Sequence, residues 1–359
     1  MTLREALSQI PDPRASNRQY PLWSLLALIL VAFLSRVDSL RGVERFARTN
    51  SHLLPHLGLR KAPGHTRLTT FLHGLAPQAL GQALRQVFPE ADLEEVLVVD
   101  GKTLRGSGKG KSSQVKLVEV LALHLGTTLG GGQGGQGPPG PLGAPWGRGV
   151  EGEGGGGGCR VPVPGGGPGD TGKRGDYLFL LKGNQGELLA WAEEVFRGVA
   201  EKRLPGETEA TWWVERDGEV WTYRVLASPY LPEEMRAFPY AQQVVRLERE
   251  VVHRGTGEVR RTVSHALTSL GPLEADALVL GRLMVGRWGI ENASFWVRDV
   301  LFREDGSQVR GVGAEVLAAL RAFLVSLLHL RGVRGKKAAL EAFSFNPLSA
   351  LRFLGLYAT

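Results

Sequence analysis

The chain has 359 residues, 43% hydrophobic and 22% charged, so it can bury a proper core and form about two or three structural units. Its single cysteine excludes an intrachain disulfide and a zinc site built from cysteines, and favours a cytoplasmic protein. The net charge of +7 favours a polyanionic partner, nucleic acid first, although many proteins are mildly basic without such a partner.

The longest apolar stretch, residues 21–35, is too short to cross a membrane. A membrane-spanning helix needs roughly 20 apolar residues, and the charged residues before this stretch are unlike a signal peptide. We therefore expect a buried helix there and no membrane association.

Residues 1–90 show helical periodicity broken by turn signals, which predicts a helical N-terminal domain. Within it, residues 58–75 combine a basic turn with a following helix, as in helix-turn-helix DNA-binding proteins. Polar residues on the early turns of that helix are His65, Arg67, Thr69 and Thr70. Short helix pairs are common in helical domains, so a purely structural role is the alternative.

From residue 95 onward, apolar strands alternate with amphipathic helices, which predicts an α/β core. Alternating runs around Asp217-Gly218 and around residues 255–257 predict antiparallel hairpins inserted into that core. The expected parts after the N-terminal domain are the first part of the core (91–205), a β-rich insertion (206–270), and the second part of the core with C-terminal helices (271–359).

Residues 130–169 hold 20 of the 49 glycines and seven prolines, a composition that cannot form a packed core. A flexible loop is the simple interpretation, but the segment stands where an α/β domain needs a strand and a helix. Glycine codons shifted by one base encode valine, alanine, glutamate or glycine, and Gly158-Cys159 can become Asp-Ala. We hypothesise that residues 130–171 are out of frame, with the frame restored near residues 172–176.

Two carboxylates and this hidden aspartate would form a three-carboxylate site. Asp100 ends an apolar strand and Glu291 lies on a predicted downstream helix. Such a site binds two divalent metals, usually Mg²⁺ or Mn²⁺, because hard cations prefer oxygen ligands. Taken singly, Asp100 could be a turn residue, and Glu291 could form a helical ion pair with Arg287.

Four longer motifs accompany these residues: "IPDPRASNRQYPLWSLLALILVAFLS", "VVDGKTLRGS", "GDYLFLLKGNQGEL" and "RWGIENASFWVRDVLFREDGSQVR". In sequence and order they resemble the DDE transposases of bacterial insertion sequences, most closely the H-repeat-associated group. The resemblance covers nearly the whole chain except residues 130–171.

The resemblance implies an RNase H-like core with Asp100 as the first metal carboxylate and Glu291 as the third. The family's second carboxylate lies in an Asp-Ala pair about 20 residues before the "GDY" motif, near Gly157 or Gly158, where this chain has none. The shifted codons of Gly158 and Cys159 independently give an Asp-Ala pair at the same place. The chain also departs from the family pattern around Glu291, with arginine at 287 before Trp288 where a histidine is usual.

Several basic and polar residues are expected to contact DNA. Lys102 and Arg105 stand beside Asp100, Lys182 and Asn184 follow a strand, and Arg287 and Arg298 share the helix of Glu291. Solvated loop cations, and turn or capping roles for the second pair, are the alternatives.

The expected function is that of an insertion-sequence transposase impaired by loss of its second aspartate. Its partners would be double-stranded DNA, as terminal inverted repeats and target, and a second copy in a homodimer on paired ends. One alternative is a catalytically inactive relic that still binds DNA. Another is a glycine-rich interaction protein on an α/β scaffold, which requires residues 130–169 to be authentic.

Overall fold

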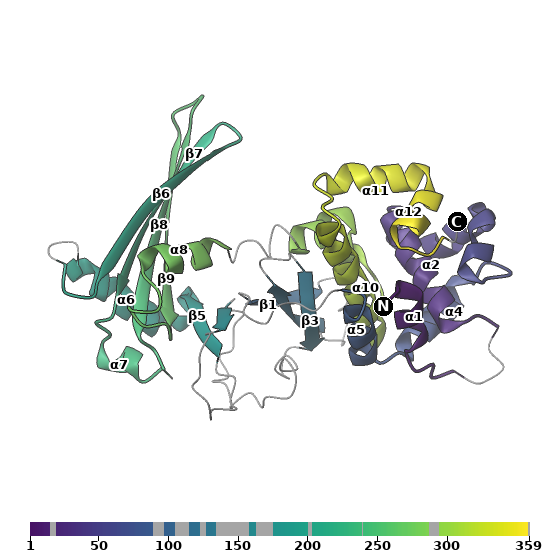
Figure 1. The fold of residues 1–359 in the computed structure, drawn as a ribbon, viewed down its shortest axis with the longest axis horizontal. Coiled ribbons are helices and arrows are strands. Elements are labelled where there is room, and N and C mark those ends of the chain that lie inside the picture. The colour runs from purple at the N-terminus through teal and green to yellow at the C-terminus, as the bar shows by residue number, and fades with distance from the viewer. Residues whose placement is uncertain are drawn as a thin grey trace. The chain divides into compact units, whose positions relative to one another are not determined.

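A computed structural model describes the protein over most of its length, in two compact units (Figure 1). The described residues are 1–14, 19–88, 97–104, 115–122, 127–133, 158–162, 175–199, 203–238, 240–286 and 294–357. The helical unit contains residues 1–92, 101–146 and 290–359, and the sheet unit contains residues 93–100 and 147–289. The helical unit therefore combines segments from both ends of the chain.

The helical unit begins with the helices that the sequence predicts. They are α1 (Leu3–Ser8), α2 (Leu22–Leu34), α3 (Leu40–Thr49), α4 (His65–His73) and α5 (Pro77–Arg85), with short 3₁₀ turns at Ser51–Leu53 and Pro55–Leu57. The unit also holds the antiparallel strands β2 (Val115–Ala122) and β3 (Thr127–Gln133). From the last third of the chain come η6 (Val297–Leu301), η7 (Glu304–Gly306), α10 (Gly311–Leu330), α11 (Lys336–Phe345) and α12 (Pro347–Phe353).

Two apolar helices, α2 and α10, lie at the centre of this unit. Every residue of α2 except Trp23 is buried, as expected for a helix that is apolar on all sides. Helix α10 is long and apolar enough to span a membrane, but 83% of its most apolar window is buried inside the protein. Both helices contribute to one hydrophobic cluster with α4 and α5, so they are core helices of this unit.

The sheet unit contains a five-stranded antiparallel sheet in the order β5-β9-β8-β7-β6. Its strands are β5 (Gly175–Leu181), β6 (Thr208–Arg216), β7 (Glu219–Ser228), β8 (Gln243–His253) and β9 (Val259–Thr268). Strand β4 (Gly158–Pro162) pairs with β5, and the first residues of β1 (Leu97–Leu104) pair with β4. The remaining elements of the unit are η4 (Gly183–Gln185), α6 (Gly186–Val199), α7 (Glu233–Arg236) and α8 (Ala277–Gly286).

The predicted hairpins are confirmed, and glycine explains one of them directly. Asp217 and Gly218 both have positive φ, 52° and 77°, which is the backbone of a tight two-residue hairpin turn. Helix α8 covers one face of the sheet, where Gly281 lies so close to Val225 and Trp212 that no larger residue fits without rearrangement. The protein is therefore a mixed α/β fold, as the sequence predicts.

Candidate nucleic-acid interface

The residues expected to form the catalytic site are described only in part. Asp100 and Lys102 lie on β1, where the structure defines the backbone, whereas Arg105, Arg287 and Glu291 lie outside the described residues. Among the residues that the structure does describe, there is no group of three histidine, cysteine or acidic side chains that could hold a metal. The predicted three-carboxylate site therefore stays a prediction.

The backbone pairing of β1 nevertheless bears on the missing carboxylate. Strand β4 runs antiparallel to β1, and Gly158 lies opposite Val99, the residue immediately before Asp100. Gly157, the other expected position, lies outside the described residues. Opposed residues of an antiparallel pair have Cα atoms about 4.5–5.5 Å apart, so position 158 lies beside Val99 and one residue from Asp100, which is in the middle of β1. Neighbouring residues of a strand face opposite sides of the sheet, so this pairing does not by itself bring a side chain at 158 to that of Asp100.

Lys182 and Asn184 lie at the junction between β5 and α6. Lys182 is exposed, and its backbone N–H donates a hydrogen bond to Gln185 Oε1 at 3.3 Å. Asn184 belongs to the 3₁₀ turn η4, which leads directly into α6. This part of the chain forms the turn and cap that begin α6, and Lys182 remains at the surface.

Arg298 takes a position different from the one expected. Its side chain is fully buried, and Nη2 lies 2.7 Å from Glu304 Oε2. Arg321 of α10 lies on the other side of the same carboxylate, with Nη1 3.8 Å from Glu304 Oε1. A buried guanidinium in a core ion pair is not accessible to a DNA phosphate, so Arg298 supports the helical unit from within.

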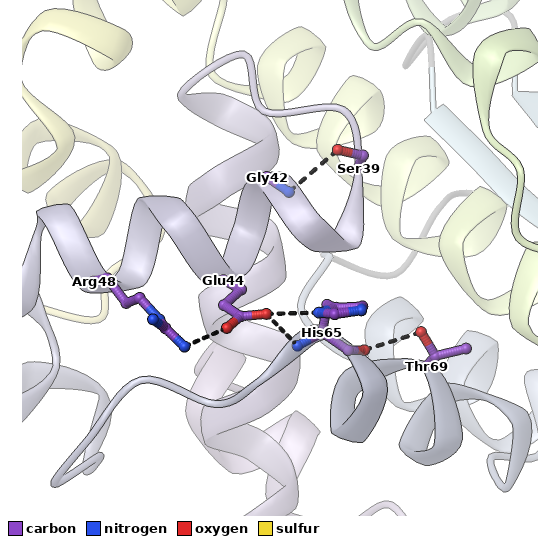
Figure 2. Close-up of polar contacts among 6 residues, drawn as sticks. All are labelled: Ser39, Gly42, Glu44, Arg48, His65 and Thr69. Atoms are coloured by element: carbon purple, nitrogen blue, oxygen red, sulfur yellow. Dashed lines mark hydrogen bonds and ion pairs between the residues drawn. The ribbon is translucent and has the colours of Figure 1, made fainter.

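The predicted DNA-binding helix, α4, is held against α3 by a carboxylate (Figure 2). Its N-cap is Gly64, which has no side chain to accept a hydrogen bond from the first turn. Glu44 of α3 takes that role: Oε2 accepts from the His65 backbone N–H at 2.8 Å and lies 2.7 Å from His65 Nδ1. Glu44 Oε1 in turn pairs with Arg48 at 2.5 Å. The start of α4 is therefore fixed by tertiary contacts.

The contact between Glu44 and His65 predicts that the protein loses stability in acid. Hydrogen bonds from the His65 backbone, and then from its side chain, lower the pKa of the Glu44 carboxyl below its ordinary value of 4.5. A lowered pKa means that the stabilisation is complete above pH 4.5 and is lost as the pH falls through the folded-state pKa. We expect Glu44→Gln to be less stable than the parent protein near neutral pH and to lose this difference in acid. Urea midpoints measured across that range test this, and a constant difference between the two proteins would contradict it.

The other expected residues of α4 divide between exposed and internally bonded groups. Arg67 is exposed, donates to Gln19 Oε1 at 2.9 Å and stacks over the Tyr20 ring. The hydroxyls of Thr69 and Thr70 donate to carbonyls one turn earlier in the same helix, at 2.9 and 3.1 Å. Their methyl groups and oxygen lone pairs remain available for contacts outside the helix.

The positive charge of the protein is concentrated in its N-terminal helices. Residues 1–88 contain eleven lysines and arginines against four aspartates and glutamates, an excess of seven. The remaining 271 residues contain 32 lysines and arginines and 32 aspartates and glutamates, so their formal net charge is zero. The first 88 residues therefore carry the whole positive excess. The overall charge of the chain conceals this asymmetry, which a charge count over each predicted domain would have revealed.

Comparisons with known proteins also match this basic helical region, and they extend over most of the chain. A model of the family described as DDE_Tnp_1-associated matches residues 4–87, the same basic helical region. Three relatives from Escherichia coli align with 91% of this chain. "Putative transposase YncI" of strain O157:H7 is 23% identical, over 87% of its own length. "Putative protein YbfL" of strain K12 is 24% identical and "H repeat-associated putative transposase YhhI" of strain K12 is 23% identical, each over 90% of its own length. Together with the motifs, these matches support the resemblance to transposases of the H-repeat-associated group.

Proposed function

We propose that the protein is an insertion-sequence transposase that binds the ends of its element and cuts and rejoins DNA strands by metal-dependent phosphoryl transfer. The observation that carries this proposal is the alignment of 91% of the chain with relatives named as transposases. The charge excess of residues 1–88 supports DNA as the partner, because clustered cations gain affinity by displacing the counterions of phosphates.

The proposed chemistry depends on carboxylates in an RNase H-like core. Asp100 and Glu291 would hold Mg²⁺ or Mn²⁺, whose chemistry would be to activate a water or a DNA 3′-hydroxyl and to stabilise the leaving oxygen. Lys102, Arg105, Lys182, Asn184 and Arg287 are the proposed contacts to DNA near these carboxylates. We further propose that the protein acts in the cytoplasm as a homodimer on paired element ends.

We propose that this copy is impaired in strand cleavage. Neither Gly157 nor Gly158 supplies the second carboxylate that the family resemblance implies at this place. A two-metal site that lacks one of its ligands would lose most of its phosphoryl-transfer activity. The second candidate function, a relic that binds DNA without cutting it, follows from the same observation.

A purified protein and a duplex carrying the terminal repeat test these alternatives. In Mn²⁺ we expect a gel shift of the terminal-repeat duplex without strand nicking, and a weaker shift with a shuffled duplex of equal length. Nicking would contradict the impairment and leave the transposase assignment intact. Equal or absent shifts with both duplexes would contradict the proposed function and favour the glycine-rich interaction protein.

A further inference from the structure

Helix α4 lies between two hollows in the surface of the helical unit. Residues 65, 69 and 73 line one of them, and residues 66, 67 and 70 line the other. Successive helical residues are about 100° apart, so Thr66, Thr70 and His73 face away from the buried Leu68, Phe71 and Leu72. All three outward residues are exposed. The exposed face of α4 between the two hollows is therefore polar.

Each hollow is lined by basic side chains. The first, of about 590 Å³, is lined by Gln19, Tyr20, Lys61, Ala62, Gly64, Thr66, Arg67 and Thr70. The second has a volume of about 750 Å³ and is lined mainly by residues from the start of α3, from α4 and from the segment that leads into α10. The lining residues are Phe33, Asp38, Ser39, Leu40, Arg41, His65, Thr69, His73, Gly306, Ser307, Gln308, Val309, Arg310 and Leu317. The first hollow has no acidic residue in its lining, and Asp38, the acidic residue in the second, already pairs with Arg303 at 3.2 Å.

Three of these cations have no acidic partner among the residues that the structure describes. Arg41, Lys61 and Arg310 are exposed and form no ion pair within the described part of the chain. Unpaired cations on both sides of α4 leave a positive potential that an anionic ligand would neutralise. The lining therefore favours a ligand that presents negative charge along both sides of the helix.

Helix ends strengthen this potential in the second hollow. Ser39, Leu40 and Arg41 form the start of α3, and Arg310 is the N-cap of the 20-residue helix α10. The α10 N-cap makes no side-chain hydrogen bond, so the first N–H groups of that helix have no side-chain acceptor from the cap. Helix N-termini carry partial positive charge and bind phosphate. Glu44 already meets the start of α4, so α3 and α10 supply this contribution.

We propose that α4 and its two flanking hollows form the surface that binds duplex DNA. Thr66, Thr70 and His73 face base edges in the major groove, which is about 12 Å wide and admits one helix. The two phosphate backbones lie in the hollows, one on Lys61 and Arg67 and the other on Arg41 and Arg310. This inference rests on the proposed function, because it names the surface by which the transposase holds its DNA.

The surface is composite, because Arg310 comes from the last third of the chain. Helix α10 packs against α4, and both contribute to the same hydrophobic cluster. The DNA-binding surface therefore belongs to the whole helical unit, and residues 1–90 alone lack one of its phosphate contacts. Variants must accordingly be made in the full chain.

The test measures fluorescence anisotropy of a labelled terminal-repeat duplex over a series of salt concentrations. Lys61→Ala, Arg41→Ala and Arg310→Ala should each weaken binding several-fold and reduce the slope of log affinity against log salt by about 1 per lost phosphate contact. Thr66→Ala and Thr70→Ala should reduce the preference for the terminal repeat over a shuffled duplex, with the slope unchanged.

Matched controls are Arg85→Ala and Arg334→Ala, which remove exposed arginines that line neither hollow. Far-ultraviolet circular dichroism confirms that each variant is folded. The inference is overturned if the control variants reduce the slope as much as Arg41→Ala and Arg310→Ala, or if no variant changes it. If either result is obtained while the parent protein still prefers the terminal repeat, only the proposed surface is contradicted and the proposed function is retained. A parent protein without that preference contradicts the proposed function itself.

Discussion

Restoring the reading frame across residues 130–171 is expected to give a protein that nicks terminal-repeat DNA in Mn²⁺ at least about 100-fold faster than the present chain. The present segment offers glycine at 157 and 158, where the family has its second carboxylate. Strand β4 pairs position 158 with Val99, the residue before Asp100 in β1. Restoration would return an aspartate to that position and an apolar sequence to the strand.

The controls for this experiment separate metal-dependent catalysis from contamination by another nuclease. Asp100→Asn and Glu291→Gln in the restored protein should each return nicking to the level of the present chain, because each removes a negative ligand while keeping the size of the side chain. DNA binding by these two variants should persist. A gene without a one-base slip near codon 130 and a compensating slip near codon 172 would overturn the premise, as would a restored protein that nicks no faster.

Glu304→Gln is expected to destabilise the helical unit by roughly 3–5 kcal/mol. Glu304 is buried between Arg298 and Arg321, whose side chains are 0% and 1% exposed. Burial lowers the pKa of Arg321, and the Glu304 carboxylate opposes that effect. Loss of the carboxylate would leave two guanidinium groups in the core without their shared counter-charge, which costs far more than the net strength of the pair.

The matched control is Glu341→Gln, which breaks an exposed ion pair with Arg36 at 3.0 Å. It should change the free energy of unfolding by less than about 1 kcal/mol. Urea denaturation followed by circular dichroism compares the two variants, and equal effects would contradict the proposed importance of the buried pair. Replacing Glu304, Arg298 and Arg321 together with apolar residues of similar size should recover most of the lost stability, since the two guanidinium groups are then removed together with their shared carboxylate.

Several features of the fold follow from the sequence alone because they depend on neighbouring residues. The periodicity of residues 1–88 predicts α1 to α5, and the uninterrupted apolar run of α2 predicts its burial. The Asp217-Gly218 pair predicts a tight hairpin because both residues tolerate positive φ. The motifs around Asp100 and Glu291 likewise establish the transposase resemblance without any knowledge of the fold.

Tertiary packing decided the positions that no local pattern encodes. Arg298 was expected at the surface, yet the turn after η6 brings Glu304 to it and α10 brings Arg321 from the other side. The candidate phosphate contacts Arg41 and Arg310 are separated by most of the chain, and they line one hollow because α3, α4 and α10 share a core. Sequence patterns record preferences over a few residues, whereas these contacts arise only when distant apolar surfaces are buried together.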